Sequence, residues 1–264
     1  MRPYIGITDV PSSEWLFERL TVFQEEGDRE IPHQLHAGVM MSRKSLHGIA
    51  TKYDAVWPKN HDIVRIFSMH HADVLNVLHY ADYDGLTTID DLVNAVRYGG
   101  HNLDAVQLDM PWPNLELVAA LKKKHPEVRL ILQVGSRALG QIGDEPKPLI
   151  ERVQDYAGWI DDVLLDKSGG EGRPMDAEVL RPFVEVLHKS MPRLGLTVAG
   201  GLGPDTLHLV APLVRDFPML SIDAQGQLRS GGSSKQPIET ERADAYLRGA
   251  VAMFLSTVPS GAPI

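Results

Sequence analysis

The chain has 264 residues, of which 43% are hydrophobic and 23% are charged, a composition that is usual for a globular protein. Its formal net charge of −9 excludes a general binder of nucleic acid or anionic membranes, because contact with many phosphates requires a basic face. The absence of cysteine excludes disulfides, thiolate metal sites and a cysteine nucleophile.

Eight short apolar segments predict β-strands. Several of them lack a clean alternation of apolar and polar residues, which is typical of parallel strands that are buried on both faces. In chain order the predicted strands span residues 3–8, 33–41, 73–80, 105–110, 128–134, 161–166, 195–200 and 219–224.

Amphipathic segments between these strands predict helices. Thr and acidic residues open the segment 87–98, and basic residues close the segment 113–125, as capping and the helix dipole favour. We expect one helix and a long loop within residues 43–72. The other predicted helices span residues 14–26, 148–160, 175–189, 204–214 and 239–255.

The alternation of strand and helix predicts a (β/α)8 TIM barrel, a single domain of residues 1–258 followed by a frayed tail, 259–264. An open doubly wound sheet is the competing arrangement, but eight regular units in about 250 residues favour the barrel. Active sites of such barrels lie at the carboxyl ends of the strands. By position alone the candidates are Thr8, Asp9, Ser42, Arg43, His79, Asp109, Gln133, Asp166, Gly200, Gly201, Asp223, Gln225 and Gly226.

Two glycine turns follow the seventh and eighth predicted strands, in TVAGGLGPDTL (197–207) and SIDAQGQLR (221–229). Glycine lets backbone N–H groups approach an oxyanion, and a helix predicted to begin at Pro204 adds a favourable partial charge. Each turn alone is explained by a reversal of the chain. Together, after these two strands, they favour a phosphate site.

Asp166 ends an apolar strand in VLLDKSGGEGRPMD (163–176). A carboxylate at that position is either paired or used, because an unpaired buried charge is costly. The next residue, Lys167, offers a rival chemistry, that of a Schiff-base aldolase or lyase. Adjacent strand residues point to opposite faces, so we expect only one of the two to face the barrel axis.

Five segments resemble motifs of phosphoribosylanthranilate isomerases. LLDKSGGEGRPMD resembles their strand-six Asp and Gly-Gly-x-Gly loop, TVAGGLGPDTL their Gly-Gly-Leu-x-Pro turn, and SIDAQG their Asp-x-Ser-Ser-Gly. AVQLDM resembles their Val-Gln-Leu-His, and YIGIT their Ile-Cys-Gly-Ile-Thr. The matches come in family order and cover the first strand and most of residues 105–230, whereas residues 30–100 show no convincing match.

The resemblance implies a cofactor-independent isomerisation of an aminoaldose phosphate to an aminoketose phosphate. It places the family's general acid on Asp166 and the sugar-side carboxylate on Asp223. Arg43, at the second strand end, pairs with a carboxylate or phosphate, or is simply solvated. With Arg43 and Asp223, the predicted substrate- and phosphate-binding residues are Gly170, Gly172, Gly200, Gly201, Gln225 and Gly226.

The family's general base, the Cys of strand one, falls on Ile5, which cannot take a proton. We therefore consider Asp9, Asp109 and His79 as the partner of Asp166. Seven of the eleven histidines lie between residues 33 and 79, which suggests a metal. In the HxxH of this region, however, the two rings point to opposite faces of a strand, so we expect no metal site.

We expect an isomerase that acts on a small phosphorylated molecule, with no nucleic-acid or membrane partner; a homodimer is left open. The chain begins without a signal-peptide pattern and has no apolar run near the ~20 residues of a membrane span, so we expect it in the cytoplasm. Two alternatives remain, an aldolase or lyase that uses Lys167 and a non-catalytic phospho-ligand-binding protein. Residues 43–72 form a lid, an oligomer contact or a substrate-specific wall.

Overall fold

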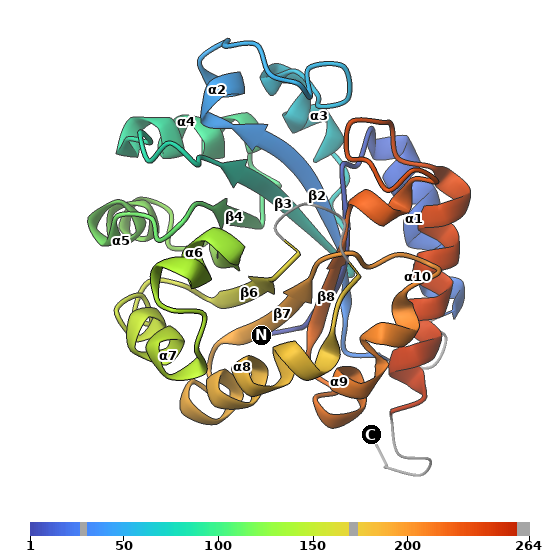
Figure 1. Ribbon diagram of the computed structural model, residues 1–264. Helices are drawn as coiled ribbons and strands as arrows, with labels where there is room; N and C mark the ends of the chain where they lie inside the picture. The colour runs from blue at the N-terminus through green and yellow to red at the C-terminus, as the bar shows by residue number, and fades with distance from the viewer. Residues whose placement is uncertain (27–30, 169–173, 258–264) are drawn as a thin grey trace.

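The computed structural model describes residues 1–26, 31–168 and 174–257, and its strands close into an eight-stranded barrel (Figure 1). All neighbouring strands are parallel, and β8 pairs with β1. The strands are β1 Tyr4–Thr8, β2 Gln34–Ser42, β3 Val74–Ala81, β4 Ala105–Asp109, β5 Arg129–Gly135, β6 Asp162–Asp166, β7 Gly195–Ala199 and β8 Ser221–Ala224.

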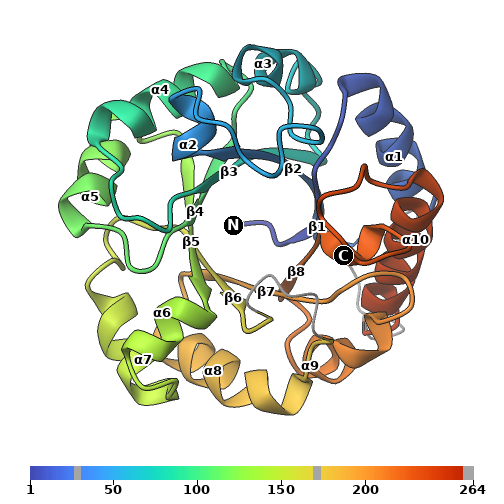
Figure 2. The ribbon, with the colours of Figure 1, turned by 45° about the horizontal axis from the view of Figure 1, so that its top comes forward.

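The helices surround the barrel, as the view along its axis shows (Figure 2). The α-helices are α1 Ser13–Glu26, α2 Arg43–Leu46, α3 Ile63–Ile66, α4 Ile89–Gly99, α5 Leu115–Lys124, α6 Ser136–Gln141, α7 Pro146–Gln154, α8 Ala177–Ser190, α9 Ala211–Asp216 and α10 Thr240–Leu255. Three short 3₁₀ helices, η1 Asn60–Asp62, η2 Leu207–Leu209 and η3 Gly226–Leu228, complete the set. Among the described residues, no helix combines the length and the apolar character needed to cross a bilayer.

Each strand is buried on both faces, which explains the nearly continuous apolar runs of the sequence. On β1, Ile5 and Ile7 belong to the outer core between the strands and the helices. Tyr4 belongs to a separate inner cluster that fills the barrel. Because side chains alternate along a strand, Gly6 and Thr8 share the inner face with Tyr4.

An ion pair closes the N-terminal end of the barrel. Arg129, the first residue of β5, donates from two of its nitrogens to the two carboxylate oxygens of Asp162, the first residue of β6. A Cβ atom on Gly195 would lie 1.8 Å from an oxygen of Asp162, so only glycine leaves room for this carboxylate. The pair is therefore enclosed by backbone as well as by side chains.

The predicted barrel and its eight strands are confirmed, and every strand boundary lies within two residues of its prediction. Asp176 caps α8 by accepting hydrogen bonds from two backbone N–H groups of its first turn. Two predicted helices are shorter than expected. The segment 148–160 is helical from Pro146 to Gln154, and residues 43–72 hold three short helices in place of one.

The prediction of a helix that begins at Pro204 is wrong. Thr206 donates a hydrogen bond of 2.7 Å to the carbonyl oxygen of Gly201, which fixes a turn there. The α-helix begins at Ala211, where Pro212 occupies the first helical turn, the position in a helix that tolerates a residue without an N–H group. The glycine turn after β7 is therefore not followed directly by the N-terminus of an α-helix.

Candidate active site

A cavity of about 630 Å³ opens at the carboxyl ends of the strands. Gly170 and Gly172, which were predicted to cover the substrate, lie outside the described residues. Most of the other predicted site residues come together here. Those that line the cavity are His79, Asp109, Gln133, Asp166, Gly200, Gly201, Asp223, Gln225 and Gly226.

Asp166, and not Lys167, faces this cavity. One Asp166 carboxylate oxygen accepts hydrogen bonds from the backbone N–H of Ser168 at 2.8 Å and from its hydroxyl at 2.6 Å. Lys167 points away, with its Nζ 2.6 Å from Asp144 and 4.4 Å from the centre of the Phe183 ring. The strand alternation therefore separates the two as expected, and the Schiff-base alternative loses its geometric support.

Burial raises the pKa of Asp166 above its ordinary value, with a further contribution from the charge of Asp109. The hydrogen bonds from Ser168 and the charge of His79 act in the opposite direction. A raised carboxyl pKa suits proton transfer, because a group transfers a proton most efficiently when its pKa lies close to the working pH.

His79 lies in a buried chain of hydrogen bonds. Its Nε2 is 3.2 Å from Asp109 Oδ2, and its Nδ1 is 3.2 Å from the amide nitrogen of Gln107. The Gln107 amide also donates to Gln133 at 2.8 Å, and the Tyr83 hydroxyl donates to Asp109. Both ring nitrogens of His79 are thus engaged by neighbouring side chains.

The charge of His79 is favoured by its surroundings. Burial opposes protonation, but the hydrogen bond and charge of Asp109, together with the charges of Asp223 and Asp9, raise the pKa of His79 above its ordinary value. The nearby carboxylates thus favour the protonated ring, whereas the Gln107 amide nitrogen, which can only donate, favours an unprotonated Nδ1.

Asp223 reaches the cavity from β8 and is only 6% exposed. A Cβ atom on Gly6 would lie 2.4 Å from its Oδ1, so the glycine of β1 makes the space that this carboxyl group occupies. The Thr8 hydroxyl lies 3.2 and 3.3 Å from its two oxygens. Burial raises the pKa of Asp223 to about 7, and the charge of Asp166 contributes to that shift.

Asp9 lies next to this group but does not line the cavity. Its carboxylate oxygen accepts a hydrogen bond of 2.5 Å from Arg229 and one of 3.1 Å from Gln225. Arg229 is 1% exposed and also donates to the carbonyl oxygens of Gln225 and Gln236. The ion pair therefore anchors the segment after β8 to the end of β1, and Asp9 is occupied in that contact.

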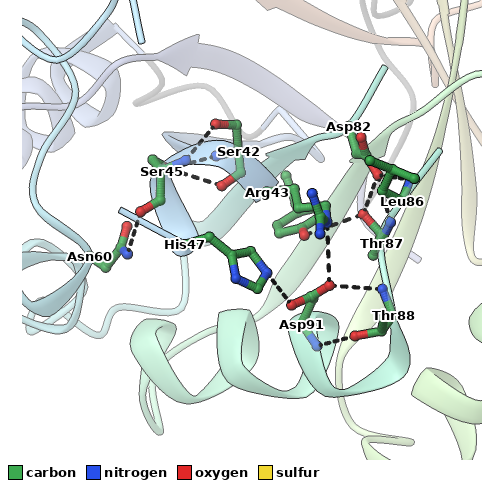
Figure 3. A network of polar contacts seen from close by, with 11 residues as sticks. Ser42, Arg43, Ser45, His47, Asn60, Asp82, Leu86, Thr87, Thr88 and Asp91 are labelled. Carbon is green, nitrogen blue, oxygen red and sulfur yellow. Dashed lines mark hydrogen bonds and ion pairs between the residues drawn. The ribbon is translucent and has the colours of Figure 1, made fainter. Parts of the chain in front are cut away.

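Arg43 is not brought to the cavity. Its Nε lies 3.7 Å from Asp91 at the start of α4, and His47 contacts the other Asp91 oxygen at 2.7 Å (Figure 3). Asp91 also forms a capping box with Thr88, as Figure 3 shows. Of the two uses predicted for Arg43, pairing with a carboxylate is the one that the structure contains. Arg43 makes this contact because α2 directs its side chain toward α4.

Residues 43–72 supply one wall of the cavity. Tyr53 and Trp57 stack with ring centres 4.5 Å apart, and Lys52 lies beside them. Arg137 and Tyr83 also line the cavity, and the Arg137 guanidinium lies 5.1 Å from the centre of the Tyr83 ring. None of these five residues was predicted, because four lie in loops and Arg137 lies in the short helix α6, where no periodic pattern marks a side chain as inward.

Gln107 was missed as well, although the sequence contains the signal. It stands two residues before Asp109 on the same strand, and alternation puts both on the inner face.

Among the residues that the structure describes, no group of three or more His, Asp or Glu side chains is arranged to hold a metal ion. The two rings of the HxxH segment lie apart: His36 stacks on Tyr4 inside the barrel, and His33 packs on Phe254 of α10.

Comparison with solved structures gives matches over nearly the whole chain. Phosphoribosylanthranilate isomerase from Thermus thermophilus is 16% identical with a TM-score of 0.59, covering 94% of this chain and 99% of that chain. The enzyme from Thermotoga maritima is 18% identical with a TM-score of 0.59, covering 95% and 99%. The chain shares its fold with phosphoribosylanthranilate isomerases.

The likeness is one of architecture. Active domain 2 of a chitinase from Pyrococcus furiosus matches with a TM-score of 0.57 at 10% identity, covering 100% of this chain and 98% of that chain. No protein-family model and no curated protein sequence matches the chain. Function must therefore be argued from the site, because one barrel supports many chemistries.

The position matched to the Cys of phosphoribosylanthranilate isomerase lies on the outer face of β1. Ile5 is fully buried in the outer core between strands and helices. A cysteine at this position would face the helices and would not reach the cavity. Ile5 therefore does not mark a missing group in the cavity.

Proposed function

We propose that the protein is an acid/base isomerase of the phosphoribosylanthranilate isomerase type that acts on a small phosphorylated molecule without a cofactor. The observation that carries this proposal is the position of Asp166 in the cavity, directly beside the glycine turn after β7. A Cβ atom on Gly200 would lie 2.7 Å from Asp166 Oδ1, so carboxylate and turn are in contact. A phosphate held by the turn would then place the adjoining carbon atoms near the carboxyl group.

Backbone forms much of the wall that we assign to phosphate. Gly200 and Gly201 have φ angles of +107° and +65°, which favour glycine. A Cβ atom on Gly226 would lie 3.0 Å from the carbonyl oxygen of Gly232, so the turn after β8 packs closely on the following loop. Walls of this kind let backbone N–H groups approach an oxyanion, which supports the assignment. The net charge of −9 is no obstacle, since the contact is local.

The anion site is tested by calorimetric titration with inorganic phosphate. Ser234 lines the cavity, whereas Ser233 on the same loop does not. A carboxylate introduced by Ser234→Asp repels the anion, so we expect at least a tenfold loss of phosphate affinity, with Ser233→Asp close to wild type. Equal affinities in the two variants, or no binding by wild type, would contradict the site.

The chemistry is tested by turnover on a panel of phosphorylated aldoses and aminoaldoses. Asp166→Asn keeps the shape of the side chain and removes proton transfer, so we expect activity to fall about 10²–10⁴-fold. Asp144→Asn, which alters the partner of Lys167 outside the cavity, is the matched control and keeps activity. Undiminished turnover by Asp166→Asn would refute the role of this residue.

A further inference from the structure

Two carboxyl groups, Asp166 and Asp223, line the cavity from β6 and β8, on either side of β7. The charge of Asp166 raises the pKa of Asp223, so the two groups interact electrostatically. A pair of neighbouring carboxyl groups in different surroundings divides the acid and base roles, because each environment favours a different protonation state. The hydrogen bonds and burial of the two groups indicate which one is the acid and which one is the base.

Asp166 has the surroundings of a carboxylate. The backbone N–H of Ser168 donates to it at 2.8 Å and the Ser168 hydroxyl at 2.6 Å, both to the same oxygen. A backbone N–H group can only donate, so this contact favours the ionised acceptor. The Asp166 side chain is also half-buried at the cavity, whereas Asp223 is buried.

Asp223 has the surroundings of a neutral carboxyl group. It is 6% exposed, and its contacts with the Thr8 hydroxyl, at 3.2 and 3.3 Å, are longer than those of Asp166. The Thr8 hydroxyl donates and so favours the charged form, but burial outweighs this contact. His36 Nδ1 is 3.9 Å from Asp223 Oδ1, and burial lowers the pKa of His36 to about 3, which leaves that ring neutral.

Titratable side chains approach Asp223 from several elements. The charge of His79 opposes the rise in its pKa, but burial outweighs that effect. Burial raises the pKa of both tyrosines next to Asp223, which keeps them neutral. The titratable groups whose charge or contact bears on Asp223 are Tyr4 of β1, His36 of β2, His79 of β3, Asp166 of β6 and Tyr246 of α10.

We propose that Asp223 carries the transferable proton and that Asp166 is the base of the reaction. This assignment rests on the proposed function, and it reverses the acid role that the family resemblance implies for Asp166. It also names a partner for Asp166 other than Asp9, Asp109 and His79. Asp9 is held by Arg229, and Asp109 is engaged by both His79 and Tyr83.

The proton transfers balance for an aminoaldose phosphate. Asp223 gives its proton to the ring oxygen as the C1–O bond breaks, and the nitrogen lone pair forms the C1=N bond. Asp166 then takes the proton from C2, and the C–H electrons form the C1=C2 bond of an enolamine while the C1=N π electrons return to nitrogen. Return of that proton from Asp166 to C1, with transfer of the C2 hydroxyl proton to Asp223, gives the ketone and restores both residues.

The assignment is tested by ¹³C NMR of the full chain labelled at the aspartate carboxyl carbons. We expect one carboxyl signal to titrate near pH 7, to be absent from Asp223→Asn and to persist in Asp166→Asn at a lower midpoint. Asp144→Asn is the control and leaves the signal unchanged. Absence of such a signal from wild type, or its loss from Asp166→Asn alone, would overturn the assignment.

Thr8→Val provides a second measurement if Asp223→Asn does not fold. Removal of the hydroxyl leaves burial unopposed by that contact, so the midpoint of the Asp223 signal should rise. An unchanged midpoint would count against Asp223 as the titrating group. If the enzyme turns over its substrate but the titrating carboxyl signal belongs to Asp166, this inference fails and the proposed function stands. If wild type neither binds phosphate nor turns over any substrate, the proposed function fails.

Discussion

At the N-terminal end of the barrel, Arg129 and Asp162 neutralise each other through a bidentate ion pair that is sealed from solvent. At the C-terminal end, Asp109, Asp166 and Asp223 gather around a cavity, with His79 among them. Burial raises the pKa of Asp162, but the hydrogen bonds and charge of Arg129 act in the opposite direction. Burial also raises the pKa values of Asp166 and Asp223, and there the opposing groups are Ser168, Thr8 and His79 rather than a bidentate arginine.

This difference separates stability from function within one fold. Polar groups at the N-terminal end of a barrel are placed to hold strands together, and those at the C-terminal end are placed to meet a ligand. Strain and unpaired charge accumulate at functional sites because the rest of the fold offsets them. Substitutions at the two ends should therefore have effects of opposite sign on stability.

The largest effect is expected from Arg129→Met. It leaves Asp162 as an uncompensated charge in the core, so the free energy of unfolding should fall by about 3–5 kcal/mol in urea denaturation. Arg152→Met removes an exposed ion pair with Asp155 and should cost less than about 1 kcal/mol. The double variant Arg129→Met/Asp162→Leu should recover most of the loss. Equal costs for the Arg129 and Arg152 substitutions would remove the contrast between the two ends.

A stabilising effect is expected from Asp223→Asn above neutral pH. The folded-state pKa of Asp223, about 7, lies above its unfolded value, so wild-type stability falls as pH rises toward 7. Relative to wild type, the variant should gain at most about 4 kcal/mol at pH 8 and little at pH 4. The measurement is the free energy of unfolding at a series of pH values. If the difference in unfolding free energy between the variant and wild type does not change with pH, folding does not raise the pKa of Asp223.

The smallest effect is expected from Arg43→Ala. Asp91 keeps its contacts with His47 and Thr88, so the free energy of unfolding should change by less than about 1 kcal/mol. Phosphate affinity should be unchanged, because the Arg43 side chain faces α4 and not the cavity. Weaker phosphate binding by this variant would return Arg43 to the site.

The sequence predicts the barrel well because strand alternation and apolar runs are local signals. Asp166 and Asp223 were placed by their positions at strand ends, and both line the cavity. The contact between Asp9 and Arg229 joins residues that are 220 positions apart, and no periodic pattern connects them. Tyr53 and Tyr83 lie in loops, whose course depends on tertiary packing rather than on local preference. The residues that form the walls of a ligand site are for this reason harder to predict than those that stabilise the fold.

The most direct test of the account is a crystal structure determined in the presence of sulfate. We predict an anion bound between the turn at Gly200-Gly201 and the turn at Gly226, beside the carboxyl group of Asp166. An empty pair of turns, or sulfate bound only at surface lysines and arginines, would contradict the claim that the C-terminal cavity receives a phosphorylated ligand.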